Sequence, residues 1–152
     1  MREATGPEFI ALLGYEWHSS KSGDYCLLFP DDQPDLFLPD HVEKLLDFAA
    51  AKKALAIPHH VGNKLGWRGA NWEQFRPEVS PVVDVFSEHG CTESDRAPNP
   101  MPRHNNGGRS TANTIQAQLP AACDLVLWLR ATITAVIPVH MARGSPESGL
   151  PI

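Results

Sequence analysis

Residues 55–63, LAIPHHVGN, decide how the fold of this chain is interpreted. A short apolar run leads into His59 and His60, and a glycine and an asparagine then end it. This pattern predicts a buried strand that delivers imidazoles to a rim where a loop begins. Imidazole is the commonest metal ligand among protein side chains. If the strand continued through both histidines, they would point to opposite faces, so we favour His59 in the site with His60 supporting it or packing.

Two further stretches have the same design, an apolar run followed by a carboxylate and an imidazole. They are residues 9–18, FIALLGYEWH, which end in Glu16 and His18, and residues 81–90, PVVDVFSEHG, which contain Glu88 and His89. Carboxylate oxygens and imidazole nitrogens are suitable ligands for zinc, manganese or iron. Three apolar strands that each finish in Glu or His predict a metal site at one end of a sheet or barrel.

Several of these residues also have ordinary structural interpretations. A glutamate at a strand end, such as Glu16, often pairs with an arginine, but the recurrence of ligand types at equivalent places favours a metal or catalytic role. His18 is interpreted as a metal ligand, as a partner of a ligand, or as an exposed turn residue. Asp84 either supports the site or caps a neighbouring loop.

Composition excludes several classes of protein. The chain has 152 residues, 42% hydrophobic and 20% charged, which suits one globular domain with a core. A formal net charge of -5 gives no basic surface for nucleic acid. No apolar run has the length of a membrane span, and the first residues lack the apolar core of a signal peptide. Three widely spaced cysteines form neither a disulfide framework nor a zinc pair, so we expect a cytoplasmic setting.

The order of the elements predicts an α/β fold. Residues 9–17 and 25–29 are expected to be strands, paired as a hairpin. Asp40 with Glu43 resembles a capping box and predicts a helix to about Lys53. Strand, helix, strand without a hairpin turn predicts a parallel βαβ unit over residues 25–58, with residues 81–86 as the third parallel strand.

Long loops follow these strands. Residues 63–77 carry Arg68, with one helical turn expected at 71–75, and residues 91–108 carry Arg103. Loops after strand ends are where α/β enzymes keep substrate contacts. Arg68 and Arg103 are therefore candidates for holding a phosphate, although most loop arginines are simply solvated.

Four blocks of the sequence together resemble one family. They are GYEWHSS, DYCLLFP, IPHHVGNKLGWRGANWE and VVDVFSEHGCTESD, within residues 9–119. The chain resembles an uncharacterised family of the PHP (polymerase and histidinol phosphatase) superfamily of metal-dependent phosphoesterases. That resemblance implies the central strands of a distorted (βα)7 barrel, with two or three metal ions at the strand ends. It also implies that Glu16 matches a bridging glutamate, His59 a histidine after a buried strand, and His89 the ligand after the next strand.

The chain departs from the superfamily pattern at both ends. It has neither the first His-x-His pair nor the last Asp-Asp-His motif. We interpret the first absence as truncation. For the second, we expect a frameshift near Pro120, because the genetic code permits an Asp-Asp-His block in another frame of residues 130–144. Residues 1–122 are then a partial hydrolase domain and residues 123–152 an atypical tail.

The resemblance therefore implies a fragment of a hydrolase that uses metal-activated water, with a small phosphorylated substrate and zinc, manganese or iron. The alternative is a catalytically inactive fragment that binds metal or a partner, or a pseudogene product. The expected catalytic residues are Glu16, His59 and His89, the expected metal ligands are Glu16, His18, His59, His60, Glu88 and His89, and the expected substrate contacts are Arg68 and Arg103.

Overall fold

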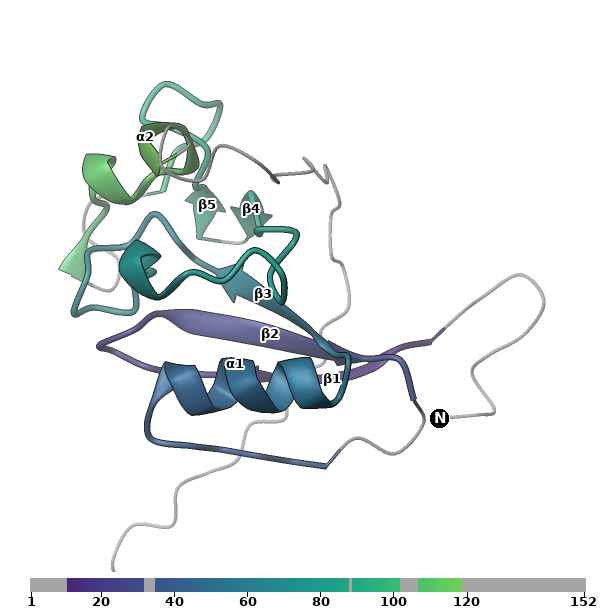
Figure 1. Ribbon diagram of the computed structural model, residues 1–152. Coiled ribbons are helices and arrows are strands. Elements are labelled where there is room, and N and C mark those ends of the chain that lie inside the picture. Colours follow the sequence, from purple (N-terminus) through teal and green to yellow (C-terminus); the bar gives the residue numbers. More distant parts are fainter. Residues whose placement is uncertain (1–10, 32–34, 88, 102–106, 119–152) are drawn as a thin grey trace, which may run out of the picture.

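The computed structural model of the chain describes residues 11–31, 35–87, 89–101 and 107–118. Its strands are β1 (Leu13–Trp17), β2 (Asp24–Phe29), β3 (Leu55–His59), β4 (Phe86–Ser87) and β5 (Gly90–Cys91). Its helices are α1 (Val42–Ala51), α2 (Ile115–Gln118) and two single 3-10 turns, Trp72–Gln74 and Thr111–Asn113. Figure 1 shows α1 beneath a three-stranded sheet, with β4, β5 and α2 above it.

The sheet begins with the predicted hairpin. β1 pairs with β2 in antiparallel register, Leu13 opposite Phe29 and Trp17 opposite Tyr25. β3 pairs with the other edge of β2, which gives the order β1-β2-β3. Since successive side chains of a strand alternate between the two faces, this register decides which residues can form a core and which can form a site.

The lower face of the sheet and α1 enclose the main core. Tyr15, Trp17, Tyr25 and Leu27 on the strands pack with Leu45 of the helix and their neighbours in one buried cluster. Val42, Leu45, Leu46 and Ala49 are the buried positions of α1, at the spacing that places them on one helical face. With this face covered, the residues between them in the strands, Glu16 among them, are directed to the opposite face.

The prediction of a parallel βαβ unit is wrong, because β2 and β3 are antiparallel. Residues 35–39, which connect β2 to α1 in the sequence, make an additional extended pass along the sheet. Tyr15 Oη donates to the carbonyl of Phe37 at 2.7 Å, and Trp17 Nε1 donates to that of Pro39 at 3.0 Å, so this pass runs in the direction of β1. Helix α1 therefore starts at the far end and returns, and β3 leaves parallel to β1 instead of β2 (Figure 1).

The expected part of a (βα)7 barrel is also wrong for the residues that the structure describes. They form two antiparallel sheets, and no barrel closes. Residues 81–85 are not a strand. The strand that follows them is the two-residue β4, and it pairs antiparallel with β5. Two backbone hydrogen bonds, Ala56 N–H to Val79 O and Asp84 N–H to Pro58 O, hold residues 79–84 beside β3. They are too unevenly spaced for a regular ladder, and Pro58 has no N–H to extend it.

The predicted capping box of α1 is wrong as well. The residue before the helix is His41, in an extended conformation, and no side chain caps the first turn. Helix α1 ends at Ala51, before Lys53, which has a left-handed φ of +54°. The single turn expected at residues 71–75 is confirmed by the 3-10 turn Trp72–Gln74, which Asn71 caps by accepting from the Glu73 N–H. The predicted tail, residues 123–152, lies outside the described part of the chain.

Among the described residues, none of the helices combines the length and apolar character that crossing a lipid bilayer requires.

Candidate metal centre

The carboxyl ends of β1 and β3 lie at the same end of the sheet, because both strands run in the same direction on either side of β2. Glu16 lies opposite Cys26, and Cys26 lies opposite Ile57, so these residues form one row across the upper face. His59 lies on the same face, two residues after Ile57, and is paired in register with Asp24. The expectation that strand ends would bring Glu16 and His59 together is confirmed.

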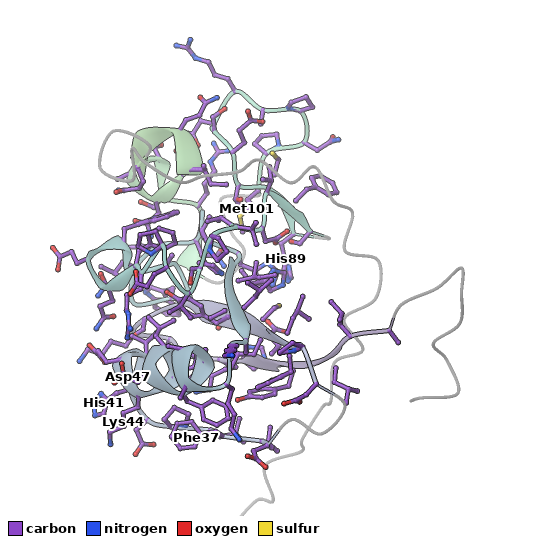
Figure 2. The ribbon with its side chains drawn as sticks, turned by 45° about the vertical axis from the view of Figure 1, so that its right-hand side comes forward. Phe37, His41, Lys44, Asp47, His89 and Met101 are labelled. Atoms are coloured by element: carbon purple, nitrogen blue, oxygen red, sulfur yellow. The ribbon has the colours of Figure 1, made fainter. Side chains whose placement is uncertain are left out.

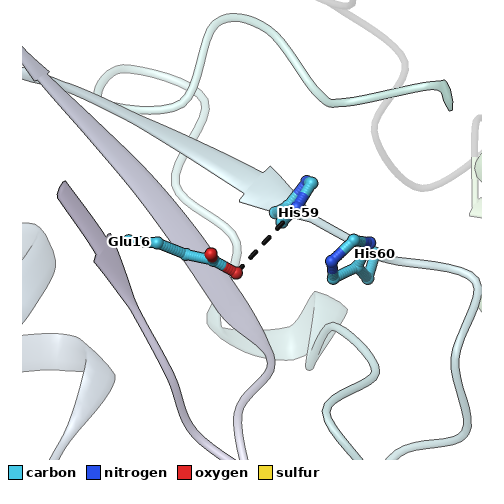
Figure 3. A group of neighbouring side chains, drawn as sticks. All are labelled: Glu16, His59 and His60. Atoms are coloured by element: carbon cyan, nitrogen blue, oxygen red, sulfur yellow. Dashed lines mark ion pairs between the residues drawn. The ribbon is translucent and has the colours of Figure 1, made fainter. Parts of the chain in front are cut away.

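His60 leaves the strand in a left-handed conformation, with a φ of +53°. This turn brings its ring beside that of His59 instead of sending it to the opposite face, and the two ring centroids are 3.4 Å apart. Figure 3 shows Glu16, His59 and His60 directed toward one another. His60 is also buried, and both histidines lie in one group with Glu16, where the sequence pattern favoured His59 with His60 supporting it or packing.

Glu16, His59 and His60 satisfy the geometry of a metal-binding group. Each offers one ligand atom, and the three atoms lie within 4.8 Å of one another. His59 Nε2 is 3.9 Å from Glu16 Oε1 (Figure 3). Glu16 Oε1 is buried and has no hydrogen-bond partner among the described residues. A buried carboxylate oxygen without a hydrogen-bond donor is costly, and the nearest guanidinium nitrogen, Arg68 Nη2 at 3.7 Å, offsets its charge without reaching hydrogen-bond distance. A divalent metal ion bound directly to this oxygen would remove the remaining cost, so these residues fit such an ion.

Both histidines are held through their Nδ1 atoms. His59 Nδ1 lies 2.7 Å from Asp84 Oδ2, and Asp84 is buried. His60 Nδ1 lies 3.2 Å from the hydroxyl oxygen of Ser87. The Nε2 atoms are then the nitrogens that remain for the site, as in metal centres where a second residue orients each imidazole. Asp84 thus has both positions that the sequence suggested as alternatives, since its Oδ1 also accepts from the backbone N–H of Phe86 at 3.3 Å.

The environment keeps His60 uncharged. Burial lowers the pKa of His60 to about 2, and the neighbouring His59 and His89 act in the same direction. A neutral imidazole has a lone pair available on one nitrogen. Burial also favours the neutral form of the Cys26 thiol, whose pKa it moves upward. Burial, with the nearby charge of Glu16, raises its pKa to about 12, so it remains a thiol near neutral pH.

Arg68 occupies the neighbouring part of the site. Glu16, His18 and Asp24 form a second group with potential ligand atoms within 4.8 Å of one another. The guanidinium of Arg68 lies beside this group and provides its positive charge. Nε and Nη2 contact Asp24 Oδ2 at 2.7 and 2.6 Å, and Nη2 lies 2.7 Å from His18 Nδ1 and 3.7 Å from Glu16 Oε1. Two of the donors that the sequence assigned to a substrate phosphate are therefore engaged with Asp24.

Of the remaining predicted site residues, the structure describes His89. The ring centroid of His89 lies 4.5 Å from that of His60, and Figure 2 shows His89 above the sheet, on the side away from Phe37 and α1. His89 is therefore next to the group, without belonging to either set of atoms within 4.8 Å. Glu88 and Arg103 lie outside the described residues.

Sequence reasoning missed two residues of this region, Asp24 and Ser87. Asp24 is the first residue of β2, one position before the strand that the sequence predicted over residues 25–29. The position of Ser87 between Asp84 and His89, after an apolar run, was a signal for a supporting role.

The chain matches no family model, no curated protein and no solved structure in the comparisons made. The sequence resemblance to the PHP superfamily therefore stays a prediction, and function has to be argued from the site itself.

Proposed function

We propose that this chain binds a divalent metal ion through Glu16, His59 and His60 and serves in a metal-dependent hydrolase that acts on a phosphate ester. The observation that carries the proposal is the buried Glu16 Oε1, which has no hydrogen-bond donor among the described residues. The Glu16 carboxylate and one ring nitrogen each of His59 and His60 nevertheless lie within 4.8 Å of one another. One carboxylate and two histidines form a common ligand set for catalytic zinc, and also suit manganese and iron.

The chain's own residues would do two things. Asp84 and Ser87 orient the two imidazoles through Nδ1. Glu16 supplies negative charge within reach of both rings. The metal ion, when bound, would lower the pKa of a water molecule and withdraw charge from the ester oxygen.

Arg68 contributes positive charge at the border of this site. Its side chain is 31% exposed and its Nη2 lies 3.7 Å from Glu16 Oε1, so it can attract an anionic substrate electrostatically while remaining paired with Asp24. This pairing also favours the second candidate, a protein that binds metal without turnover, because a phosphate-binding fork of Arg68 is already used.

Metal titration and hydrolysis assays separate the two. Mn²⁺ or Zn²⁺ binding is measured by isothermal titration calorimetry on the wild-type chain and on the variants Glu16→Gln and His59→Ala. His41→Ala is the matched control, because His41 is an exposed histidine before α1 on the other side of the sheet. We expect both site variants to lose at least about tenfold in affinity and the control to bind like wild type.

Hydrolysis of a generic phosphomonoester and a phosphodiester, with the same metal added, then tests the reaction. Turnover that disappears in Glu16→Gln and His59→Ala supports the hydrolase. Binding with no turnover supports the second candidate. Equal metal affinity in wild type and both site variants excludes this site altogether.

A further inference from the structure

His59 and His60 are contacted from one short segment of the chain. Asp84 reaches Nδ1 of His59, and Ser87, three residues later, reaches Nδ1 of His60. Two consecutive imidazoles are therefore each contacted at the same ring atom, and Nε2 remains on each. The segment is itself fixed to β3, because Asp84 N–H donates to the carbonyl of Pro58 at 3.0 Å.

Ser87 is firmly placed for this contact. It ends β4 and pairs with Gly90 of β5. Its hydroxyl oxygen accepts from the backbone N–H of His89 at 3.1 Å, which uses one of its two lone pairs and leaves the second for Nδ1 of His60, 3.2 Å away. Thr92 holds the start of the same segment, since its hydroxyl donates to the carbonyls of Asp84 and Val85.

We infer that Ser87 is a positioning residue for His60: its oxygen accepts the Nδ1 proton and so leaves the Nε2 lone pair for the metal site. The tautomer of a neutral histidine is set by the hydrogen bond that its other nitrogen makes. If Ser87 were removed, no other hydrogen bond described at Nδ1 would specify which nitrogen of His60 holds the proton. The inference rests on the proposed function for its purpose, but the tautomer can be measured without any metal.

The deciding experiment is long-range ¹H–¹⁵N correlation of the histidine rings in metal-free protein. For wild type we expect His60 with the proton on Nδ1 and a bare Nε2. Ser87→Ala should convert this to a mixture, or to Nε2–H, and Ser87→Thr, which keeps the hydroxyl, should retain the wild-type signals. Ser80→Ala is the matched control, because Ser80 is also buried and its hydroxyl has no hydrogen-bond partner among the described residues.

Zn²⁺ affinity, measured by competition with a chromogenic chelator, gives the second readout. Removal of a residue that orients a ligand typically costs about 10–100-fold in metal affinity, and we expect this from Ser87→Ala but not from Ser87→Thr or Ser80→Ala. If wild-type His60 holds its proton on Nε2, or if Ser87→Ala leaves the tautomer unchanged, the inference is overturned even when metal binds. If the tautomer shifts as expected and no variant, including wild type, binds metal, the positioning role stands and the proposed function fails.

Discussion

Replacing Arg68 by methionine measures how much the fold depends on one counterion. The side chain of Asp24 is completely buried, and Arg68 contacts its Oδ2 through both Nε and Nη2. Removing one partner of an enclosed ion pair leaves an uncompensated buried charge, at a cost of roughly 3–5 kcal/mol. Because Arg68 is itself 31% exposed, water can enter the space that it leaves. We therefore expect a loss near the lower end, about 3 kcal/mol in the free energy of unfolding.

Arg76→Met provides the matched control. Arg76 also contacts two carboxylates, at 2.7 Å on Asp47 and 2.9 Å on Glu78, but those side chains are 72% and 62% exposed. Exposed pairs contribute little, so this variant should lose less than about 1 kcal/mol. The assay is urea unfolding followed by tryptophan fluorescence, with the double variant Arg68→Met/Asp24→Asn expected to recover part of the loss. Equal losses for the two arginine variants would refute the assignment of a structural charge to Asp24.

The remaining predictions concern the core, a close backbone approach and pH. Leu45→Ala should lower the free energy of unfolding by about 2–5 kcal/mol in urea titrations, since this side chain is fully buried under the sheet. Gly69→Ala should destabilise more than Gly66→Ala in thermal unfolding, because a Cβ at Gly69 would lie 2.0 Å from the carbonyl oxygen of Asn63. A Cβ at Gly66 would have no atom within 4 Å, so that variant has only the strain of its positive φ of +85°; similar melting temperatures would contradict this. Burial raises the pKa of Tyr25 to about 12, so the folded state keeps a proton that the unfolded state releases above pH 10. Stability should therefore be unaffected by this group below pH 10 and fall by up to about 1.4 kcal/mol per pH unit as pH rises toward 12, and Tyr25→Phe should remove that slope in pH-dependent denaturation.

Local patterns predicted the elements of this fold better than their arrangement. The hairpin of β1 and β2, the position of α1 and the strand before His59 follow from periodicity and turn residues. The relative directions of these elements do not follow from the same signals, because residues 35–39 have no regular pattern that predicts an extended segment along the sheet. Two hydrogen bonds from aromatic side chains fix that pass, and both join residues 22 positions apart in the chain.

The site could be predicted where it depends on strand alternation and could not where it depends on a special backbone conformation. Glu16 and His59 follow from alternation along β1 and β3. The pairing of His60 with His59 follows from a left-handed φ at a histidine, a conformation that few non-glycine residues adopt and that sequence alone does not indicate. The role of Asp24 depends on Arg68, which reaches it from 44 residues later in the chain.

The extra pass of residues 35–39 also lengthens the connection between β2 and β3. The hairpin needs only local contacts, whereas the pairing of β3 with β2 closes a loop that contains the pass and α1. Contacts between distant parts of a chain form late because loop closure costs entropy first. Glu16 and His59 therefore meet only in molecules that have completed the sheet. An ion that requires both would bind the finished fold alone and would stabilise it by mass action.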